Sequence, residues 1–247
     1  MKILEIYNGL ITEAEITSCV KKFGYELFGH ELGGSELNTN TENNYLDLIK
    51  SFTDTNYGTK MSDKFIKSIE VLKGCVNQYP EVLIPEKTKV FRGIEIPIRY
   101  FIENNQTINT SGSIPYIYKA NSQIQSWSNS FDIGGTFGNH NSLNDTASEI
   151  ELSEFSTAEA RQNLLKILIE KNLKVAFVLE YDTNTKEFIF KSKYFRMLSS
   201  AHHEDELIRI DNRPIKTLAH FNNSEDVFLT MKGLTLLKYI NAGIKGI

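Results

Sequence analysis

The sequence lacks the features that would suit a disulfide scaffold or a nucleic-acid-binding arm. It contains two cysteines, Cys19 and Cys75, which are too few for a disulfide framework and lack metal-ligand spacing. We interpret both as small buried residues of a protein in a reducing compartment. Positive charge is also scarce, because 27 Lys and Arg residues stand against 31 Asp and Glu residues, with no long run of one sign. Nonspecific binding to a phosphate backbone therefore has no overall electrostatic support.

No targeting or membrane-spanning segment is recognisable. Near the start, Lys2 and Glu5 interrupt what would have to be the apolar core of a secretory signal, and no small-residue cleavage site follows. Nowhere do the roughly eighteen consecutive apolar residues of a membrane-spanning helix occur. We expect a cytoplasmic protein, in the cell that makes it or in a target cell, with no membrane partner.

Length and composition leave one large domain or two small ones as the options, and we expect a single domain over residues 1–247. The 247 residues correspond to about 1.6 times a usual domain, and the 40% apolar content is that of an ordinary globular chain. Residues 1–86 are expected to form a mainly helical lobe, with apolar stripes at helical spacing in 45–52 and 63–72. Residues 87–247 are expected to form a β-rich core, so the fold class is α+β.

Two-residue periodicity predicts the strands of this second part. They are expected at residues 89–96, 123–128, 174–181, 187–191 and 206–210. One convincing helix is inserted among them, at 157–171. The stretch 134–138 is expected to be a glycine-rich loop, and it matches neither the Walker pattern nor the dinucleotide GxGxxG pattern.

An arginine is predicted on an apolar strand face. Arg92 lies two residues after Val90 and four before Ile96, so the three side chains share one side of the strand. A buried guanidinium is very costly unless it meets an anion, so Arg92 indicates either a bound anionic ligand or a structural ion pair.

Hydroxyl and carboxylate side chains repeat at two-residue spacing on two other strands. Ser126 and Ser128 share one face, whereas Trp127 points to the other and is assigned to the core. Glu204 and Glu206 would share a face, and two such carboxylates need a cationic partner or a cationic transition state. The alternatives are an edge strand with hydrated serines and a solvated acidic turn. The adjacent His202 and His203 would point in opposite directions, so no metal site is expected.

Taken in chain order, these motifs resemble those of a known enzyme family. Phe91-Arg92-Gly93, Ser126-Trp127-Ser128 and Glu204-Asp205-Glu206 resemble the Arg, Ser-X-Ser and Glu-X-Glu motifs of mono-ADP-ribosyltransferases of the toxin and bacteriophage branch. The resemblance covers roughly residues 45 to 211, and it departs from many relatives where Trp127 replaces a threonine. It implies a helical N-terminal lobe packed on a split two-sheet β core. It also implies a glycosyltransferase that cleaves the nicotinamide-ribose bond of NAD and transfers ADP-ribose.

The resemblance also implies a role for each motif residue, with NAD as substrate and no metal. Glu206 would stabilise the oxocarbenium-like ribose, and Ser126 would hold Glu206 with support from Ser128. Arg92 would meet the NAD phosphates, and the backbone of Gly93 would approach the nicotinamide amide.

Two further residues complete the implied machinery. Glu204 would orient an acceptor arginine and take its proton, as the family's Glu-X-Glu motif favours. Phe137 would stack on nicotinamide or, alternatively, only anchor its loop.

The acceptor of ADP-ribose remains open at this point. An arginine of a target protein is the leading expectation, with RNA or DNA bases and water as the alternatives. With water as acceptor the enzyme would be an NAD glycohydrolase. A catalytically inactive binding protein is a further reading of the same residues. An antitoxin or another inhibitor is a further partner that we expect for an enzyme of this type.

Overall fold

A computed structural model describes residues 74, 84–120, 124–184, 189–191, 206–211, 213–224 and 227–246. Several sequence predictions fall outside these residues. They are the helices at 45–52 and 63–72, both cysteines, the histidine pair and Glu204. Among the described residues, no helix is both long enough and apolar enough to cross a membrane.

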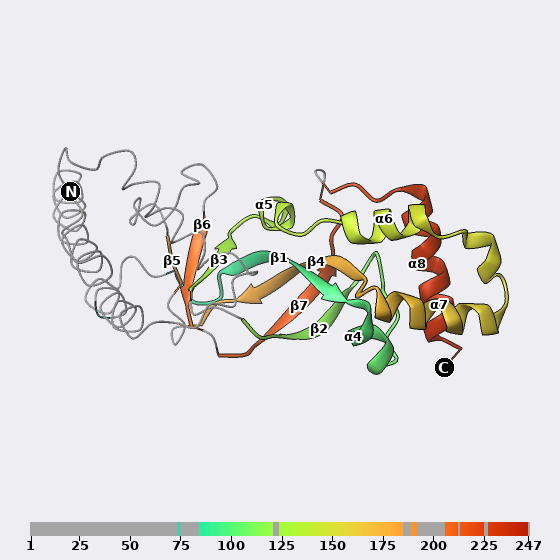
Figure 1. Cartoon of the computed structure of the whole chain (residues 1–247). Helices are drawn as coiled ribbons and strands as arrows, with labels where there is room; N and C mark the ends of the chain where they lie inside the picture. Colours follow the sequence, from blue (N-terminus) through green and yellow to red (C-terminus); the bar gives the residue numbers. More distant parts are fainter. Residues whose placement is uncertain are drawn as a thin grey trace, which may run out of the picture. The chain divides into compact units, whose positions relative to one another are not determined.

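The described chain mixes helices with antiparallel strand pairs, which agrees with the expected α+β class. In chain order the elements are β1 (Lys89–Pro97), α4 (Ile98–Glu103), β2 (Ser113–Tyr118), β3 (Ile124–Ser128), α5 (Phe131–Thr136), α6 (Asn141–Glu149), the 3₁₀ helix η2 (Leu152–Phe155), α7 (Ala158–Glu170), β4 (Lys174–Asp182), β5 (Ile189–Lys191), β6 (Glu206–Ile210), β7 (Ile215–Phe221) and α8 (Met231–Ile244) (Figure 1).

The chain divides into two compact units. The first unit comprises residues 1–89, 117–129 and 182–215, and the second comprises residues 90–116, 130–181 and 216–247. The described part of the first unit contains β3, β5 and β6, whereas the second unit contains most of β1, β2, β4 and β7 and all of the labelled helices.

In the first unit, β6 lies between β3 and β5 and pairs with both in antiparallel orientation. One face of the β3–β6 pair is buried and carries Trp127 and Leu207, at 2% and 3% exposure. The ring of Tyr118 meets Trp127 edge-on, with 5.8 Å between the ring centroids. The prediction that Trp127 belongs to the core is confirmed.

In the second unit, the strand order is β2-β7-β4-β1. All side chains of β4 from Val175 to Leu179 are buried, so both faces of this central strand are covered. On one face Phe101 of α4 stacks on Phe177, with ring centroids 5.4 Å apart. On the other face Phe131 of α5 meets Phe91 of β1 edge-on, with centroids 5.7 Å apart. The sheet therefore has a helix packed on each side.

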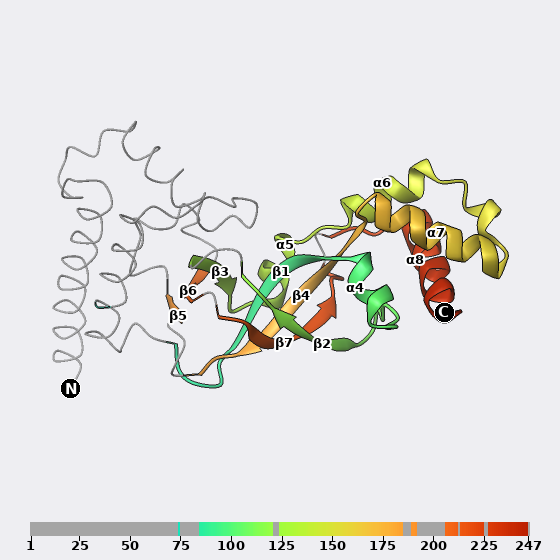
Figure 2. The same cartoon turned by 60° about the horizontal axis from the view of Figure 1, so that its bottom comes forward.

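Helices α6, α7 and α8 pack together beyond the end of this sheet, as two views show (Figures 1 and 2). Helices α7 and α8 approach each other closely. A Cβ atom placed on Gly243 of α8 would lie 3.1 Å from the side chain of Leu165 in α7. The helix predicted at 157–171 is confirmed as α7, and its N-cap Thr157 accepts a hydrogen bond of 3.1 Å from the backbone N–H of Ala160.

The sequence indicated only one convincing helix in residues 87–247, but α4, α5, α6 and α8 are also present. The strands β2 and β7 were not predicted. The expected loop at 134–138 is also partly wrong, since α5 continues to Thr136. Glycine disfavours helices, but Gly134 and Gly135 lie where a Cβ atom would contact neighbouring elements. In β7 the inward residues include Thr217 and Ala219, which weaken its hydrophobic alternation.

Candidate functional site

The two units divide the residues predicted to act on NAD. The second unit contains Arg92, Gly93 and Phe137, and the first unit contains Ser126, Ser128 and Glu206.

The register of β3 and β6 places the serine motif beside the described end of the acidic motif. Ser128 is the cross-strand partner of Glu206, and Ser126 is the partner of Ile208. Directly opposed residues of an antiparallel pair occupy the same face, with closely spaced Cβ atoms. The backbone therefore puts position 206 nearest to Ser128, although the resemblance gave the main supporting role to Ser126. The role of Ser126 stays a prediction.

A buried arginine anchors this register from the opposite face. Arg209 is 0% exposed and is the cross-strand partner of Gln125. Its Nη1 atom donates to Gln125 Oε1 at 3.2 Å and to the carbonyl of Asp211 at 2.7 Å, and its Nη2 atom donates to the carbonyl of Arg213 at 3.2 Å. A one-residue slip would move every side chain of β6 to the other face and separate Arg209 from Gln125, its cross-strand partner. Sequence reasoning missed Arg209, although its position two residues after Leu207, on the same apolar side of the strand, was a usable signal.

The turn after β6 is stabilised by an ion pair between Asp211 and Arg213. Asp211 accepts hydrogen bonds from the backbone N–H of Arg213 at 2.8 Å and from its Nε atom at 2.6 Å. Burial raises the pKa of the Asp211 carboxyl, but the hydrogen bonds from Arg213 and the charges of Arg209 and Arg213 outweigh it and leave the pKa below its ordinary value. Asp211 is therefore ionised at neutral pH. Its bonds to Arg213 hold the turn whose carbonyls accept hydrogen bonds from Arg209.

In the second unit, β1 carries Arg92 on its buried side. Arg92 is 7% exposed, and Val90 and Ile96 on the same side of the strand are fully buried. This agrees with the alternation read from the sequence. A buried guanidinium offers several N–H donors in a fixed geometry, which suits a phosphate or carboxylate group.

Gly93 packs directly against the glycine-rich turn, which we define as residues Gly134–Gly138. A Cβ atom at position 93 would lie 2.4 Å from the carbonyl oxygen of Gly134 and 2.6 Å from the backbone nitrogen of Gly138. The contact is reciprocal, because a Cβ atom on Gly134 would lie 2.9 Å from Cβ of Phe91. This close approach explains why position 93 is glycine, and contact of its backbone with a ligand stays a prediction.

Phe137 lies within the glycine-rich turn and is 57% exposed. Its backbone carbon would lie 3.0 Å from a Cβ atom on Gly93, so the turn holds Phe137 next to β1. An exposed aromatic ring on a packed backbone is suited to stack on a flat ligand.

Asn222 and His140 hold the far side of the glycine-rich turn, and sequence reasoning missed both. Asn222 is fully buried, and its Nδ2 atom donates to the carbonyls of Gly135 and Gly138 at 2.8 and 2.5 Å. The Nε2 atom of His140 lies 2.8 Å from the carbonyl oxygen of Asn222. A carbonyl only accepts hydrogen bonds, so Nε2 carries the proton of the neutral ring. The local sequence Phe221-Asn222-Asn223 contains no signal that would single out Asn222.

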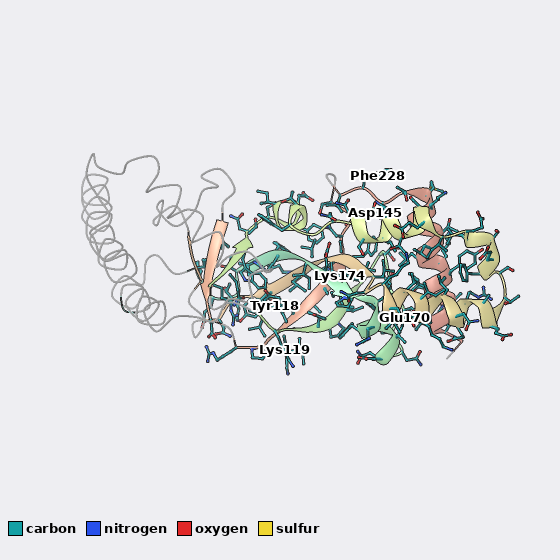
Figure 3. The ribbon with its side chains drawn as sticks, viewed as in Figure 1. Tyr118, Lys119, Asp145, Glu170, Lys174 and Phe228 are labelled. Atoms are coloured by element: carbon teal, nitrogen blue, oxygen red, sulfur yellow. The ribbon has the colours of Figure 1, made fainter. Side chains whose placement is uncertain are left out.

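The environment of His140 favours its neutral form. Its ring stacks on Phe221 with 4.7 Å between centroids. Burial lowers the pKa of His140, and the hydrogen bond to Asn222 and the charge of Glu95 offset only part of this effect. Glu95 is itself 3.7 Å from Nζ of Lys174, which is labelled in Figure 3.

A second acid–base pair lies on the α5 side of this sheet. His220 Nε2 is 3.1 Å from Glu180 Oε2, and the His220 ring meets Phe131 edge-on at 5.9 Å. Within the described ranges, no three His, Cys, Asp or Glu side chains are close enough to hold a metal ion.

Comparisons of the chain with family models, with curated proteins and with solved structures find no significant match.

Replacing Gly93 by alanine is expected to destabilise the second unit. The new methyl group would collide with two backbone atoms that cannot rotate away, and overpacking of this kind costs about 1–3 kcal/mol. Urea unfolding of Gly93→Ala should therefore show a lower midpoint. The matched control is Gly246→Ala, whose nearest neighbour would be 3.5 Å away, and it should unfold like the unchanged protein. Equal stability of both variants would contradict the close packing at Gly93.

His140 is expected to make stability fall in mild acid. Because its pKa is lowered in the folded state, the unfolded chain binds the proton first as pH drops below its ordinary value of 6.5. Its stabilising contribution is complete above about pH 6.5 and is lost as pH falls toward the folded pKa, with a slope of at most about 1.4 kcal/mol per pH unit. His140→Gln, which does not titrate, should show a flatter pH dependence in urea unfolding between pH 7.5 and 5.5. Identical pH dependence would remove His140 from this role.

Proposed function

We propose that the protein is an NAD-dependent mono-ADP-ribosyltransferase of the toxin or bacteriophage effector type. The observation that carries the proposal is the β3–β6 register, in which the second serine of Ser-X-Ser stands opposite the last glutamate of Glu-X-Glu. Two motifs that are 78 residues apart, from Ser128 to Glu206, thus occur as cross-strand neighbours. An isolated acidic turn or an isolated serine pair would not require this pairing.

The proposed reaction makes a specific demand on Glu206. The bond between nicotinamide and C1′ of the ribose breaks, its electron pair leaves with nicotinamide, and C1′ becomes positively charged. A fixed carboxylate beside C1′ stabilises this charge more in the transition state than in the ground state. A serine hydroxyl opposite the glutamate can donate to the carboxylate and restrict its rotamers. Ser128 is buried and stands at the position for this role, with Ser126 as the other donor that the resemblance implies.

Three residues of the second unit keep the roles that the resemblance implies. Arg92 would bind the phosphates, and its burial supports this role because a desolvated guanidinium binds an anion more strongly. Gly93 would contact the nicotinamide amide through its backbone, and Phe137 would stack on the nicotinamide ring. The contact between Gly93 and the backbone of the glycine-rich turn supports this assignment, since it brings the two residues together.

The finer fold proposal follows the same family. The described elements would form the split two-sheet β core of an ADP-ribosyltransferase, with residues 1–86 as its helical lobe. Antiparallel pairing of the serine strand with the acidic strand supports this arrangement.

A protein arginine is the proposed acceptor, and Glu204 is the residue that would select it. Guanidinium is protonated and non-nucleophilic, so a carboxylate must orient it and accept a proton as the new bond forms. RNA or DNA bases are less favoured because the net charge of −4 does not attract a phosphate backbone. Hydrolysis of NAD is the remaining alternative. The proposed setting is the cytoplasm of the producing or the target cell, where an antitoxin or inhibitor would restrain the enzyme.

Replacing Glu206 by glutamine should abolish NAD cleavage without unfolding the protein. Loss of the negative charge removes transition-state stabilisation and should lower nicotinamide release by about 10²–10³-fold. The matched control is Glu170→Gln at the exposed end of α7, which should retain full activity. Nicotinamide release is measured by chromatography, and circular dichroism checks folding. Full activity of Glu206→Gln would refute the site assignment.

Replacing Glu204 by glutamine should separate transfer from cleavage. Without a base for guanidinium, transfer to arginine should fall at least about tenfold while NAD hydrolysis continues. The test incubates each variant with labelled NAD and bacterial lysate and divides the product between protease and nuclease digestion. Label that protease removes supports a protein acceptor, whereas label that nuclease removes establishes the nucleic-acid alternative. Nicotinamide release without any label establishes a hydrolase.

A further inference from the structure

We infer that Asn222 is a positioning residue that sets the place of Phe137 relative to β1. The inference rests on the proposed function, because the purpose of this placement is to present Phe137 to the nicotinamide of NAD. It adds to that function a residue outside the three motifs, and this residue comes more than ten positions after the acidic strand.

Asn222 is fixed to the sheet through its own backbone. It directly follows the last residue of β7, and its N–H donates to the carbonyl of Ala176 in β4 at 3.1 Å. Its carbonyl oxygen is 2.8 Å from Nε2 of His140, and its side chain is fully buried. The side chain therefore projects from a rigid point of the second unit.

The amide of Asn222 uses both of its N–H donors on the glycine-rich turn. Nδ2 donates to the carbonyl of Gly135 at 2.8 Å and to that of Gly138 at 2.5 Å. The carbonyl of Gly135 belongs to the last turn of α5 and also accepts the backbone N–H of Gly138 at 3.1 Å, whereas the carbonyl of Gly138 lies just beyond the end of the helix. Thr136 and Phe137 are the only residues between them, so the two bonds enclose Phe137.

The orientation of the amide is also fixed. Asn222 Oδ1 accepts hydrogen bonds from the backbone N–H of Ser224 at 3.2 Å and from its hydroxyl at 2.6 Å. A flipped amide would place N–H donors against the N–H of Ser224 and its oxygen against two carbonyls. The fit is tight, because a Cβ atom on Gly135 would lie 1.9 Å from Oγ of Ser224.

Phe137 depends on these bonds because its own side chain does not hold it. The ring is more than half exposed, so little hydrophobic burial fixes its position. On the other side, the turn is limited by its contact with the backbone of Gly93. The hydrogen bonds from Asn222, which directly follows β7, hold one side of the turn, and the backbone of Gly93 in β1 packs against the other side. Together these contacts determine where the exposed ring lies.

The test replaces Asn222 by aspartate or by alanine. Asn222→Asp keeps the acceptor for Ser224 but loses both donors to the turn, and Asn222→Ala controls for the new charge. The matched control is Asn241→Asp in α8, because Asn241 makes the same kind of bonds to the backbone of Ile108, an N–H donation of 2.8 Å and an acceptance of 2.7 Å. Both asparagines should contribute to stability, but only Asn222 contacts the turn.

The first measurement is amide hydrogen exchange in the protein without NAD. Both Asn222 variants should exchange at least about tenfold faster within residues 134–138, the effect expected from losing two buried hydrogen bonds. Asn241→Asp should leave exchange there unchanged. Unchanged exchange in the Asn222 variants would overturn the inference whatever the protein does with NAD.

The second measurement is the steady-state release of nicotinamide from NAD. The Asn222 variants should raise KM for NAD about tenfold while kcat changes less than about threefold, because binding is lost and the reacting carboxylate is untouched. Phe137→Ala should show the same pattern, and adding Asn222→Ala to it should raise KM no further. Additive effects, or an equal effect of Asn241→Asp, would overturn the inference. If the unchanged protein neither cleaves nor binds NAD, the proposed function fails, and hydrogen exchange alone then decides whether Asn222 holds the turn.

Discussion

The direct packing of two backbones, that of the glycine-rich turn on that of β1, is the constraint on which the second unit depends. Gly93 and the turn leave no space for a Cβ atom between them. No water fits between backbones at this distance, so their N–H and C=O groups need hydrogen-bond partners from neighbouring parts of the protein. Asn222 provides this for two carbonyls of the turn, and it is buried for that reason. The exposed Phe137 follows from the same arrangement, since its backbone is held without the help of its side chain.

A comparable constraint operates in the first unit, where one buried cation holds a register. Arg209 must find acceptors because it is completely desolvated, and its acceptors come from β3 and from the turn after β6. The carbonyl acceptors lie close to Arg209 in the chain, whereas Gln125 is an acceptor only in the observed β3–β6 register. The alignment that sets Arg209 against Gln125 on one face is also the one that sets Ser128 against Glu206 on the other face. A structural charge thereby determines the geometry of the proposed catalytic pair.

The sequence predicts the elements in which periodicity and burial agree. β1, β3, β4, β6 and α7 were located to within about two residues, and Trp127 and Arg92 were assigned to the correct sides of their strands. Prediction failed where tertiary contact decides. The glycines of α5 signalled a loop, although they lie in a helix at positions where contacts with β1 and Ser224 leave no room for a Cβ atom.

The candidate site shows the same division between local pattern and long-range contact. Motif order pointed to Arg92 and Glu206 without any knowledge of pairing. Asn222 escaped notice because the two carbonyls to which it donates are 84 and 87 residues distant in the chain, and Arg209 because its cross-strand partner Gln125 is 84 residues distant. A hydrogen bond to a backbone carbonyl leaves no trace in the identity of the accepting residue, so such partners cannot be read from a single sequence.

In the proposed enzyme, cleavage of NAD and choice of acceptor place separate demands on the acidic strand. Cleavage requires one carboxylate beside the developing cation, and Glu206 alone can meet this requirement. A second carboxylate two residues earlier would repel the first, so Glu204 would be unfavourable in a chain that only hydrolyses NAD. An incoming guanidinium removes that repulsion, since its positive charge lies near both carboxylates before one of them takes its proton. Two glutamates at this spacing therefore suit a cationic acceptor better than water, which is the reason to propose arginine transfer over hydrolysis.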